Sequence, residues 1–240
     1  MKKAYFNWST GKDSSLALYH ILKNKEYNVT QLVTTVNKDY ERVSMHGLRE
    51  ALLDAQVKRL QLPLQKIYFP AEVSMASYDE TMKKATASLV DAGYKYGIFG
   101  DIFLEDLRKY REEKLSEVGI TAVFPLWKQD TKTLLKEMLA LGFKAITVCV
   151  NAKLLDASFV GRIVDESFLN DLPSTVDPCG ENGEFHTFVY DGPIFSSPIE
   201  FTIGEKVLKT YTPSKKEEDS CATDDSVWDT AFWYCDIIPK

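Results

Sequence analysis

The residues best suited to chemistry form one short polar segment near the amino terminus, Ser9-Thr10-Gly11-Lys12-Asp13-Ser14. Apolar residues 4–8 precede this segment and predict a strand, and residues 15–22 follow it and predict a helix. A turn at the start of a helix presents unpaired backbone N–H groups and the positive end of the helix dipole, so phosphates bind there. The segment therefore predicts a site for the phosphates of a nucleotide.

The segment could match the Walker A motif, G-x-x-x-x-G-K-[ST], but two positions exclude this match. Phe6 stands where the first glycine belongs, and Asp13 stands where that loop has its magnesium-binding hydroxyl. The segment is instead similar to the S-G-G-x-D-S loop of pyrophosphatase-type ATP enzymes, which hold the β- and γ-phosphates and cut ATP at the α-phosphate. Asp13 would then help to place Mg²⁺, which prefers carboxylate and phosphate oxygens.

Thr10 departs from that loop, which usually has glycine at this position. A β-branched residue disfavours a positive φ, so the turn either keeps an ordinary backbone or is strained at Thr10. A simpler alternative also stays open, because a Ser N-cap followed by an Asp in the first helical turn gives a similar polar loop.

Composition narrows the setting of this site. The chain has 240 residues, and its 29 Lys and Arg against 35 Asp and Glu give a net charge of −6. A broad nucleic-acid surface needs clustered basic charge, so we expect no nucleic-acid partner. No run approaches the roughly 18 apolar residues of a membrane helix, and no signal peptide is evident, so we expect a cytoplasmic protein with no membrane partner. The four cysteines lack metal-like spacing and predict free thiols.

Strand-like and helix-like segments alternate through the first 150 residues. Expected strands are residues 31–36, 64–69, 96–99, 121–124 and 143–150, and expected helices are residues 45–60, 77–92, 105–118 and 131–141. This alternation predicts a doubly wound α/β fold with a mainly parallel sheet. Ligands of such folds bind at the carboxyl ends of the strands, where Ser9–Ser14, Asn37–His46 and Gly100-Asp101 should gather.

The pattern changes beyond residue 150. Residues 159–169 predict one more helix, and short β-like runs follow from residue 185 onward. We therefore expect two domains: an ATP-binding domain over residues 1–150, and a smaller α+β domain over residues 151–240 that closes the substrate cleft.

A second polar segment, which runs from Cys179 to Pro193, places two carboxylates around an Asn-Gly turn. A hairpin needs only the Asn-Gly turn, so Glu181 and Glu184 are candidates for holding Mg²⁺ or for binding an amine or ammonium beside ATP. A solvent-facing hairpin whose acids have no role is the alternative. His186 is a candidate general base, although a single His on a strand is more often structural.

Three charged residues share one face of the helix expected after Asp101. Glu105, Arg108 and Glu112 fall at positions i, i+3 and i+7. The pattern is typical of a solvated stripe of salt bridges, and a contribution to a substrate site is the second interpretation.

Together these segments resemble the diphthine–ammonia ligase-like family of ATP-binding proteins, which belongs to the PP-loop, adenine nucleotide alpha hydrolase superfamily. The resemblance covers about residues 4–195 and is carried by residues 6–14, 45–46, 100–102, 124–127 and 179–193. It implies a five-stranded parallel core with a smaller C-terminal domain over a cleft. It also implies an amide-forming ligase, in which ATP activates a carboxylate as an acyl-adenylate, AMP and pyrophosphate are released, and ammonia forms the amide.

The resemblance further implies roles for individual residues. The catalytic residues would be Lys12, Asp13, Glu181 and Glu184. ATP would contact Ser9, Thr10, Gly11, Lys12, Asp13, Ser14, His46, Gly100 and Asp101, with Mg²⁺ on Asp13. The acceptor or ammonia side would be lined by Glu105, Arg108, Glu181, Glu184 and His186. The acceptor carboxylate would be a small molecule or borne on a protein, and a homodimer is one assembly that we consider.

One departure and three rival functions bear on this reading. His186 stands where diphthamide-forming members often have an acidic residue, which is similar to the bacterial branch; bacteria lack diphthamide, so the acceptor there would be another carboxylate. A tRNA sulfur-transfer enzyme would need paired catalytic cysteines and a basic face. A glutamine-dependent amidotransferase would need a glutaminase nucleophile, so free ammonia or a partner subunit is the expected nitrogen source. A sensor that holds ATP or AMP without turnover stays open.

Overall fold

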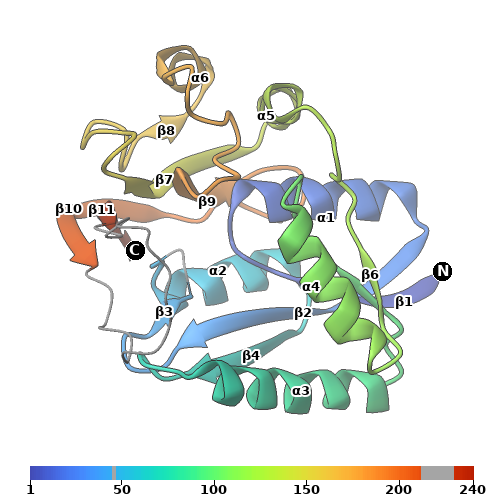
Figure 1. The fold of residues 1–240 in the computed structure, drawn as a ribbon. Coiled ribbons are helices and arrows are strands. Elements are labelled where there is room, and N and C mark those ends of the chain that lie inside the picture. Colours follow the sequence, from blue (N-terminus) through green and yellow to red (C-terminus); the bar gives the residue numbers. More distant parts are fainter. Residues whose placement is uncertain (45–46, 212–229) are drawn as a thin grey trace.

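A mainly parallel sheet forms the larger part of the fold. The computed structural model describes residues 1–44, 47–211 and 230–240 (Figure 1). The strands of this sheet are β1 (Lys2–Asn7), β2 (Tyr27–Asn37), β3 (Arg42–Val43), β4 (Leu64–Phe69), β5 (Tyr96–Ile98) and β6 (Thr121–Val123). Five of them pair in parallel in the order β4-β2-β1-β5-β6, and the short β3 is antiparallel to the end of β2. The expected α/β class with a parallel core is therefore confirmed.

Helices cover both faces of this sheet (Figure 1). The helices α1 (Lys12–Asn24) and α2 (Glu50–Leu60) lie on one face, and α3 (Met75–Asp91) and α4 (Glu105–Ser116) lie on the other. Neighbouring residues of β1 show the division, since Phe6 packs in the core with α1 and α2 while Tyr5 packs in the core under α3 and α4. The helices change faces between β1 and β5, which is where doubly wound folds bind ligands.

The second sheet is antiparallel throughout. It contains β7 (Lys144–Asn151), β8 (Ile163–Val164), β9 (Phe185–Asp191), β10 (Phe201–Tyr211) and β11 (Thr230–Pro239), and α5 (Thr131–Ala140) and α6 (Glu166–Asp171) accompany it. The strand expected at residues 143–150 is β7, but it pairs with β9 and β11 instead of completing the parallel sheet. The two sheets therefore divide before β7, and the domain division at residue 150 stays a prediction. One hydrophobic core runs from α1 and β1 into β7 and β9.

The single helix predicted over residues 159–169 is wrong. A turn at Gly161, with φ of +68°, and the short β8 precede α6, which begins only at Glu166. The Thr147 hydroxyl donates to the Phe159 carbonyl and accepts the Arg162 N–H at 3.1 Å, so it holds the turn in place of a helix. Asp165 caps α6 by accepting the Phe168 N–H at 2.8 Å.

None of the helices in the described part of the chain combines the length and the apolar character needed to cross a lipid bilayer.

Candidate active site

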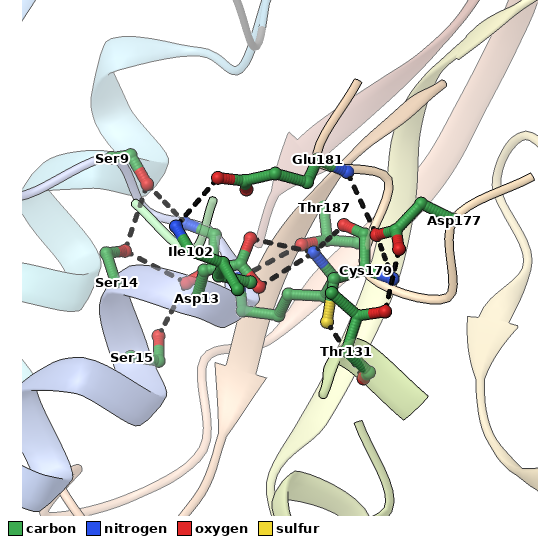
Figure 2. Close-up of polar contacts among 12 residues, drawn as sticks. Ser9, Asp13, Ser14, Ser15, Ile102, Thr131, Asp177, Cys179, Glu181 and Thr187 are labelled. Atoms are coloured by element: carbon green, nitrogen blue, oxygen red, sulfur yellow. Dashed lines mark hydrogen bonds and ion pairs between the residues drawn. The ribbon is translucent and has the colours of Figure 1, made fainter. Parts of the chain in front are cut away.

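A cavity of about 690 Å³ opens where β1 and β5 end. Much of its lining comes from three segments: the phosphate turn (residues 9–14), residues Gly100 and Asp101 after β5, and the acidic loop, by which we mean residues 177–184 before β9. Residues 179–183 are the part of the acidic loop that lines the cavity. Figure 2 shows the side chains of the phosphate turn and of the acidic loop converging from the two sheets. The structure thus brings together the two polar segments that the sequence singled out.

Short polar contacts shape the phosphate turn. The Ser9 hydroxyl lies 3.0 Å from that of Ser14, and the Ser14 and Ser15 hydroxyls donate to the Gly11 carbonyl at 3.0 and 2.9 Å. Thr10 has a φ of +74°, so the strained form of the turn is the one present. Its buried hydroxyl has no hydrogen-bond partner in the described structure.

Gln56 of α2 holds this strained turn, and sequence reasoning missed it. Its side-chain NH₂ donates to the carbonyls of Thr10 at 3.0 Å and Val189 at 2.6 Å, while its oxygen accepts the indole N–H of Trp8 at 2.9 Å. The Val189 N–H also donates to the Thr10 carbonyl at 3.1 Å. The available signal was a glutamine next to the apolar face of a predicted helix, and a single residue of that kind names no partner.

Gly100 leaves room for the start of α1. A Cβ added to Gly100 would lie 2.9 Å from the Ser14 nitrogen and 3.1 Å from the Asp13 carbonyl carbon, both of them backbone atoms. Any side chain at this position would push against the first turn of α1, whose N–H groups form the anion-binding end of the helix. Glycine is therefore required for β5 to end beside the phosphate turn.

Lys12 connects the phosphate turn with the acidic loop. Its ammonium lies 2.9 and 2.7 Å from the two carboxylate oxygens of Asp13 and donates to the carbonyl of Cys179. Burial is the largest influence on the pKa of Lys12 and lowers it, but the charge and hydrogen bond of Asp13, together with Cys179 and Glu181, outweigh burial. The pKa therefore lies above its ordinary value and the side chain is cationic. Its backbone N–H donates to the Thr187 hydroxyl at 3.0 Å, which ties α1 to β9.

Asp177 organises the acidic loop. One carboxylate oxygen accepts the N–H groups of Cys179 at 2.9 Å and Glu181 at 3.2 Å, and the other accepts the Thr131 hydroxyl at 2.7 Å. The Cys179 thiol donates to the Thr131 carbonyl at 3.3 Å, and burial raises its pKa. The thiol is thus held protonated as part of the loop framework.

Glu184 holds the loop together instead of lining the cavity. It is only 2 % exposed, and its carboxylate accepts the N–H of Asp177 at 3.0 Å, the N–H of Asn182 at 2.9 Å and the Asn182 side-chain NH₂ at 3.1 Å. With these bonds its oxygens are committed to the turn. The structure thus places Glu184 in the framework of the loop, and its expected catalytic or substrate-binding role stays a prediction.

Glu181 is the loop carboxyl that faces the cavity. Its Oε1 accepts the backbone N–H groups of Ile102 at 2.7 Å and Phe103 at 3.3 Å, which joins the loop to the end of β5 (Figure 2). Burial raises the pKa of Glu181 to about 7, although the Ile102 N–H opposes that shift. Such a carboxyl gains and loses its proton near neutral pH.

His186 also lines the cavity, from the start of β9. Burial, and then the positive charge of Lys12, lower its pKa to about 4, so the imidazole is neutral at physiological pH. A neutral imidazole accepts or donates hydrogen bonds in such a site but carries no charge.

Asp101 lines the cavity beside Arg111, a residue that sequence reasoning missed. The Arg111 Nε lies 3.0 Å from Asp101 Oδ2, and the guanidinium lies over the Phe99 ring at 4.5 Å from its centroid. Arg111 had no signal of its own in the sequence, because it stands in the same charged helix as Glu105 and Arg108, the two residues that were expected to line the site.

Glu105 and Arg108, the expected site residues of α4, are not brought together with the phosphate turn. Neither lines the cavity; exposed Glu105 pairs with Lys128 at 2.9 Å. Arg108 pairs with Glu112 at 2.7 Å and lies over the ring of Trp127 at 4.5 Å. This is the salt-bridge stripe that the spacing on α4 favoured.

Two further expectations concern His46 and the metal. His46 lies outside the residues that the structure describes. Within the described ranges, no cluster of three or more His, Cys, Asp or Glu side chains has the arrangement of a metal site. Asp13 as a ligand of Mg²⁺ stays a prediction.

Comparison with known proteins gives consistent matches over most of the chain. The family model of the diphthamide synthase N-terminal domain matches residues 1–122, and that of the diphthamide synthase C-terminal domain matches residues 130–216. The diphthine–ammonia ligase of Rattus norvegicus is 30% identical over 118 residues, which cover 47% of this chain and 44% of that protein. The enzyme of the same name from Schizosaccharomyces pombe is 28% identical over 140 residues, covering 54% of this chain and 22% of that protein.

The matched regions thus span less than half the length of these curated relatives. Among solved structures, a predicted subunit of tRNA methyltransferase from Methanocaldococcus jannaschii aligns with a TM-score of 0.41 at 20% identity, over 60% of this chain and 77% of that one. A tRNA thiolase from Methanococcus maripaludis aligns with a TM-score of 0.36 at 18% identity, over 59% and 57% of the two chains.

Proposed function

Because the chain belongs to the diphthamide synthase family, we propose that it is an ATP-dependent amide-forming ligase that releases AMP and pyrophosphate. One observation carries the proposal: Lys12 and Thr187 fasten the phosphate turn to the strand that follows the acidic loop, so that a phosphate site and a carboxyl with a pKa of about 7 share one cavity. A site that only binds ATP has no need of such a carboxyl beside the phosphates.

In the first step, an oxygen of the acceptor carboxylate attacks the α-phosphorus of ATP. The bond from that phosphorus to the bridging oxygen breaks, and its electron pair leaves with pyrophosphate. The N–H groups at the start of α1 and the Lys12 ammonium would stabilise the negative charge that develops on the leaving pyrophosphate. The product of this step is an acyl-adenylate, whose carbonyl carbon is a far better acyl donor than a carboxylate.

Mg²⁺ would enter as part of the substrate, bound to the phosphates of ATP. A Mg²⁺ ion bound in this way needs only one or two protein carboxylates, so the lack of a three-ligand cluster in the described residues fits it. Asp13 is the carboxylate within the phosphate turn, and both its oxygens face the Lys12 ammonium. Asp13 would therefore exchange part of its ion pair with Lys12 for the metal.

In the second step, ammonia attacks the acyl carbon and AMP leaves. The nitrogen sheds one proton as the amide forms, and ammonium must lose another before it can attack. We assign Glu181 as the base that accepts the proton from ammonium, because its deprotonated form is populated at neutral pH and it faces the cavity. The proton lost as the amide forms is released with the products. The acceptor is a carboxylate on a small molecule or a protein, and a homodimer remains one candidate assembly.

Product analysis tests this proposal. The protein is incubated with ATP, Mg²⁺, ammonium and a pool of cellular carboxylic acids, and AMP with pyrophosphate is scored against ADP with phosphate. AMP and pyrophosphate should form only with the pool, should be lost in Asp13→Asn, and should persist in Asp106→Asn, a control on exposed α4. ATP binding without turnover in any pool would favour the sensor, and turnover that requires tRNA would favour a tRNA-modifying enzyme.

A further inference from the structure

A second cavity of about 540 Å³ adjoins the candidate active site. It lies between α3, α4 and the face of the parallel sheet that these helices cover, and we call it the side cavity. Asn7 and Arg111 line both cavities, as do Tyr78 and Met82 of α3, so the two spaces are neighbours. Its volume lies within the range of small-molecule pockets.

The helix α3 packs poorly on the sheet because of the side cavity. Only Leu89 of its 17 residues is buried. Its apolar stripe, Tyr78, Met82, Ala85 and Leu89, lines the side cavity. An unfilled apolar space costs stability, in proportion to its volume. A ligand with an apolar body would therefore complete the packing of α3.

The opposite wall of the side cavity is apolar as well. Tyr5, Val33, Ile67 and Phe99 of the sheet form it. The charged lining residues are three acids and three bases, Asp79, Glu80, Glu117, Lys83, Arg111 and Lys114. Because these charges balance, the side cavity favours neither a cationic nor an anionic body, and apolar contact dominates its selectivity.

Arg111 gives the junction of the two cavities an anion-binding group. A guanidinium carries five N–H donors. Asp101 pairs with the Nε side of this group: Nη2 donates to Oδ1 at 3.3 Å, and Nε lies 3.0 Å from Oδ2 without forming a hydrogen bond in the described structure. The remaining donors suit a second carboxylate, and Asn7 offers amide hydrogen bonds at the same junction.

Resting on the function proposed above, we propose that the side cavity binds the body of the acceptor, and that the acceptor is a carboxylic acid with an aromatic or bulky aliphatic body. Its carboxylate lies at Arg111 and Asn7, at the opening to the cavity of the candidate active site, which we call the ATP cavity. The apolar body lies between the stripe on α3 and the sheet. Small, polar di- and tricarboxylic acids would leave this space unfilled and are excluded as substrates.

The test is a binding experiment on the full chain with phenylbutyrate as the probe, succinate as the polar control and a non-hydrolysable ATP analogue present. Ala85→Phe fills the side cavity without touching the ATP cavity, and Ala87→Phe places the same ring on the exposed side of α3. Calorimetry should show phenylbutyrate binding equally to the wild type and Ala87→Phe, and at least tenfold more weakly to Ala85→Phe. The affinity for the ATP analogue should be equal in all three proteins.

Several results would overturn the inference: equal phenylbutyrate affinity in the two variants, succinate binding as tightly as phenylbutyrate, or no binding of phenylbutyrate, phenylpropionate or hexanoate. Weaker binding of the ATP analogue in Ala85→Phe would assign the side cavity to the nucleoside instead. Should Ala85→Phe fail to fold, Ala85→Leu is a smaller filling variant for the same comparison. The proposed function fails separately, through absence of AMP formation, while AMP formation from a polar acceptor at full rate in Ala85→Phe would defeat this inference alone.

Discussion

The backbone N–H of Lys12 donates to the hydroxyl of Thr187 at 3.0 Å, and both residues are buried. This bond joins the first turn of α1 to β9, and so joins the parallel sheet to the antiparallel one. The ATP cavity lies between the two parts, so its shape depends on this contact.

Replacing Thr187 with Val tests this contact. The substitution keeps the shape of the side chain but leaves the buried Lys12 N–H without an acceptor, which costs about 1–3 kcal/mol. We expect urea unfolding to show that loss together with a weaker affinity for ATP. Thr187→Ser keeps the hydroxyl and should lose less than half as much; equal losses in the two variants would assign the effect to packing.

Replacing Thr10 with Gly should stabilise the protein. Thr10 is β-branched, has a φ of +74° and carries a buried hydroxyl without a hydrogen-bond partner in the described structure. Relief of that strain outweighs the entropy that glycine adds to the unfolded chain, for a net gain of about 1 kcal/mol. Thermal unfolding measures the change, and a lower Tm for Thr10→Gly would show that the Thr side chain supports the turn.

Replacing Gly100 with Ala should weaken ATP binding. The new Cβ would lie 2.9 Å from the Ser14 nitrogen, so the end of β5 and the start of α1 must separate. Overpacking of this kind costs about 1–3 kcal/mol, and we expect ATP affinity to fall at least tenfold. Gly119→Ala is the control, because its Cβ meets nothing within 4 Å and only its positive φ of +76° is strained. ATP affinity that is equal in the two variants would contradict the role of Gly100.

The pH dependence of the reaction should follow Glu181. Its pKa is raised from 4.5 to about 7, so the deprotonated form that accepts a proton appears as the pH rises through 7. The rate of amide formation should therefore rise between about pH 6 and pH 8 and then level off. Glu181→Gln should lower the rate and remove this inflection, whereas His186→Asn should keep it, because the pKa of His186 lies at about 4.

The same shift affects stability, with a defined sign. Between pH 4.5 and 7 the folded chain holds a proton on Glu181 that the unfolded chain releases, so the Glu181 carboxyl increasingly destabilises the fold as the pH rises through this window. The free energy of unfolding of Glu181→Gln should therefore gain on that of the wild type from pH 5 to pH 8. We expect a gain of about 1–2 kcal/mol, because the carboxyl is partly exposed. A difference that is constant with pH would show that the pKa is not raised.

The parallel core and the phosphate turn could be predicted from local sequence, because strand and helix periods are local signals. The strand expected at residues 64–69 has those bounds in the structure. The sheet that a strand joins is decided by distant partners, so β7 was recognised as a strand but assigned to the parallel set. Residues 159–169 have helical apolar spacing, yet Thr147 on another strand holds their first half in a turn.

The candidate site also has one part that local sequence predicts and another that depends on distant contacts. Phosphate binding follows from the order strand, small polar turn and helix, all within Ser9–Ser14. Glu181 and Glu184 differ by only three positions and are chemically alike, so their division into one cavity-facing and one framework carboxyl depends on which backbone N–H groups the fold brings to each. The roles of Gln56 and Arg111 depend on their contacts with Thr10 and Asp101, which are ten or more positions away in the sequence. No local sequence pattern predicts such contacts.

The most direct test of adenylation follows a heavy oxygen isotope from the acceptor. The carboxylate oxygens of the acid pool are exchanged with heavy oxygen, and the products formed with ATP, Mg²⁺ and ammonium are analysed by mass spectrometry. Adenylation predicts one heavy oxygen in AMP, and none in pyrophosphate, because the carboxylate oxygen stays on the α-phosphorus when ammonia displaces AMP. Heavy oxygen in inorganic phosphate beside ADP would show attack at the γ-phosphorus and would contradict the account.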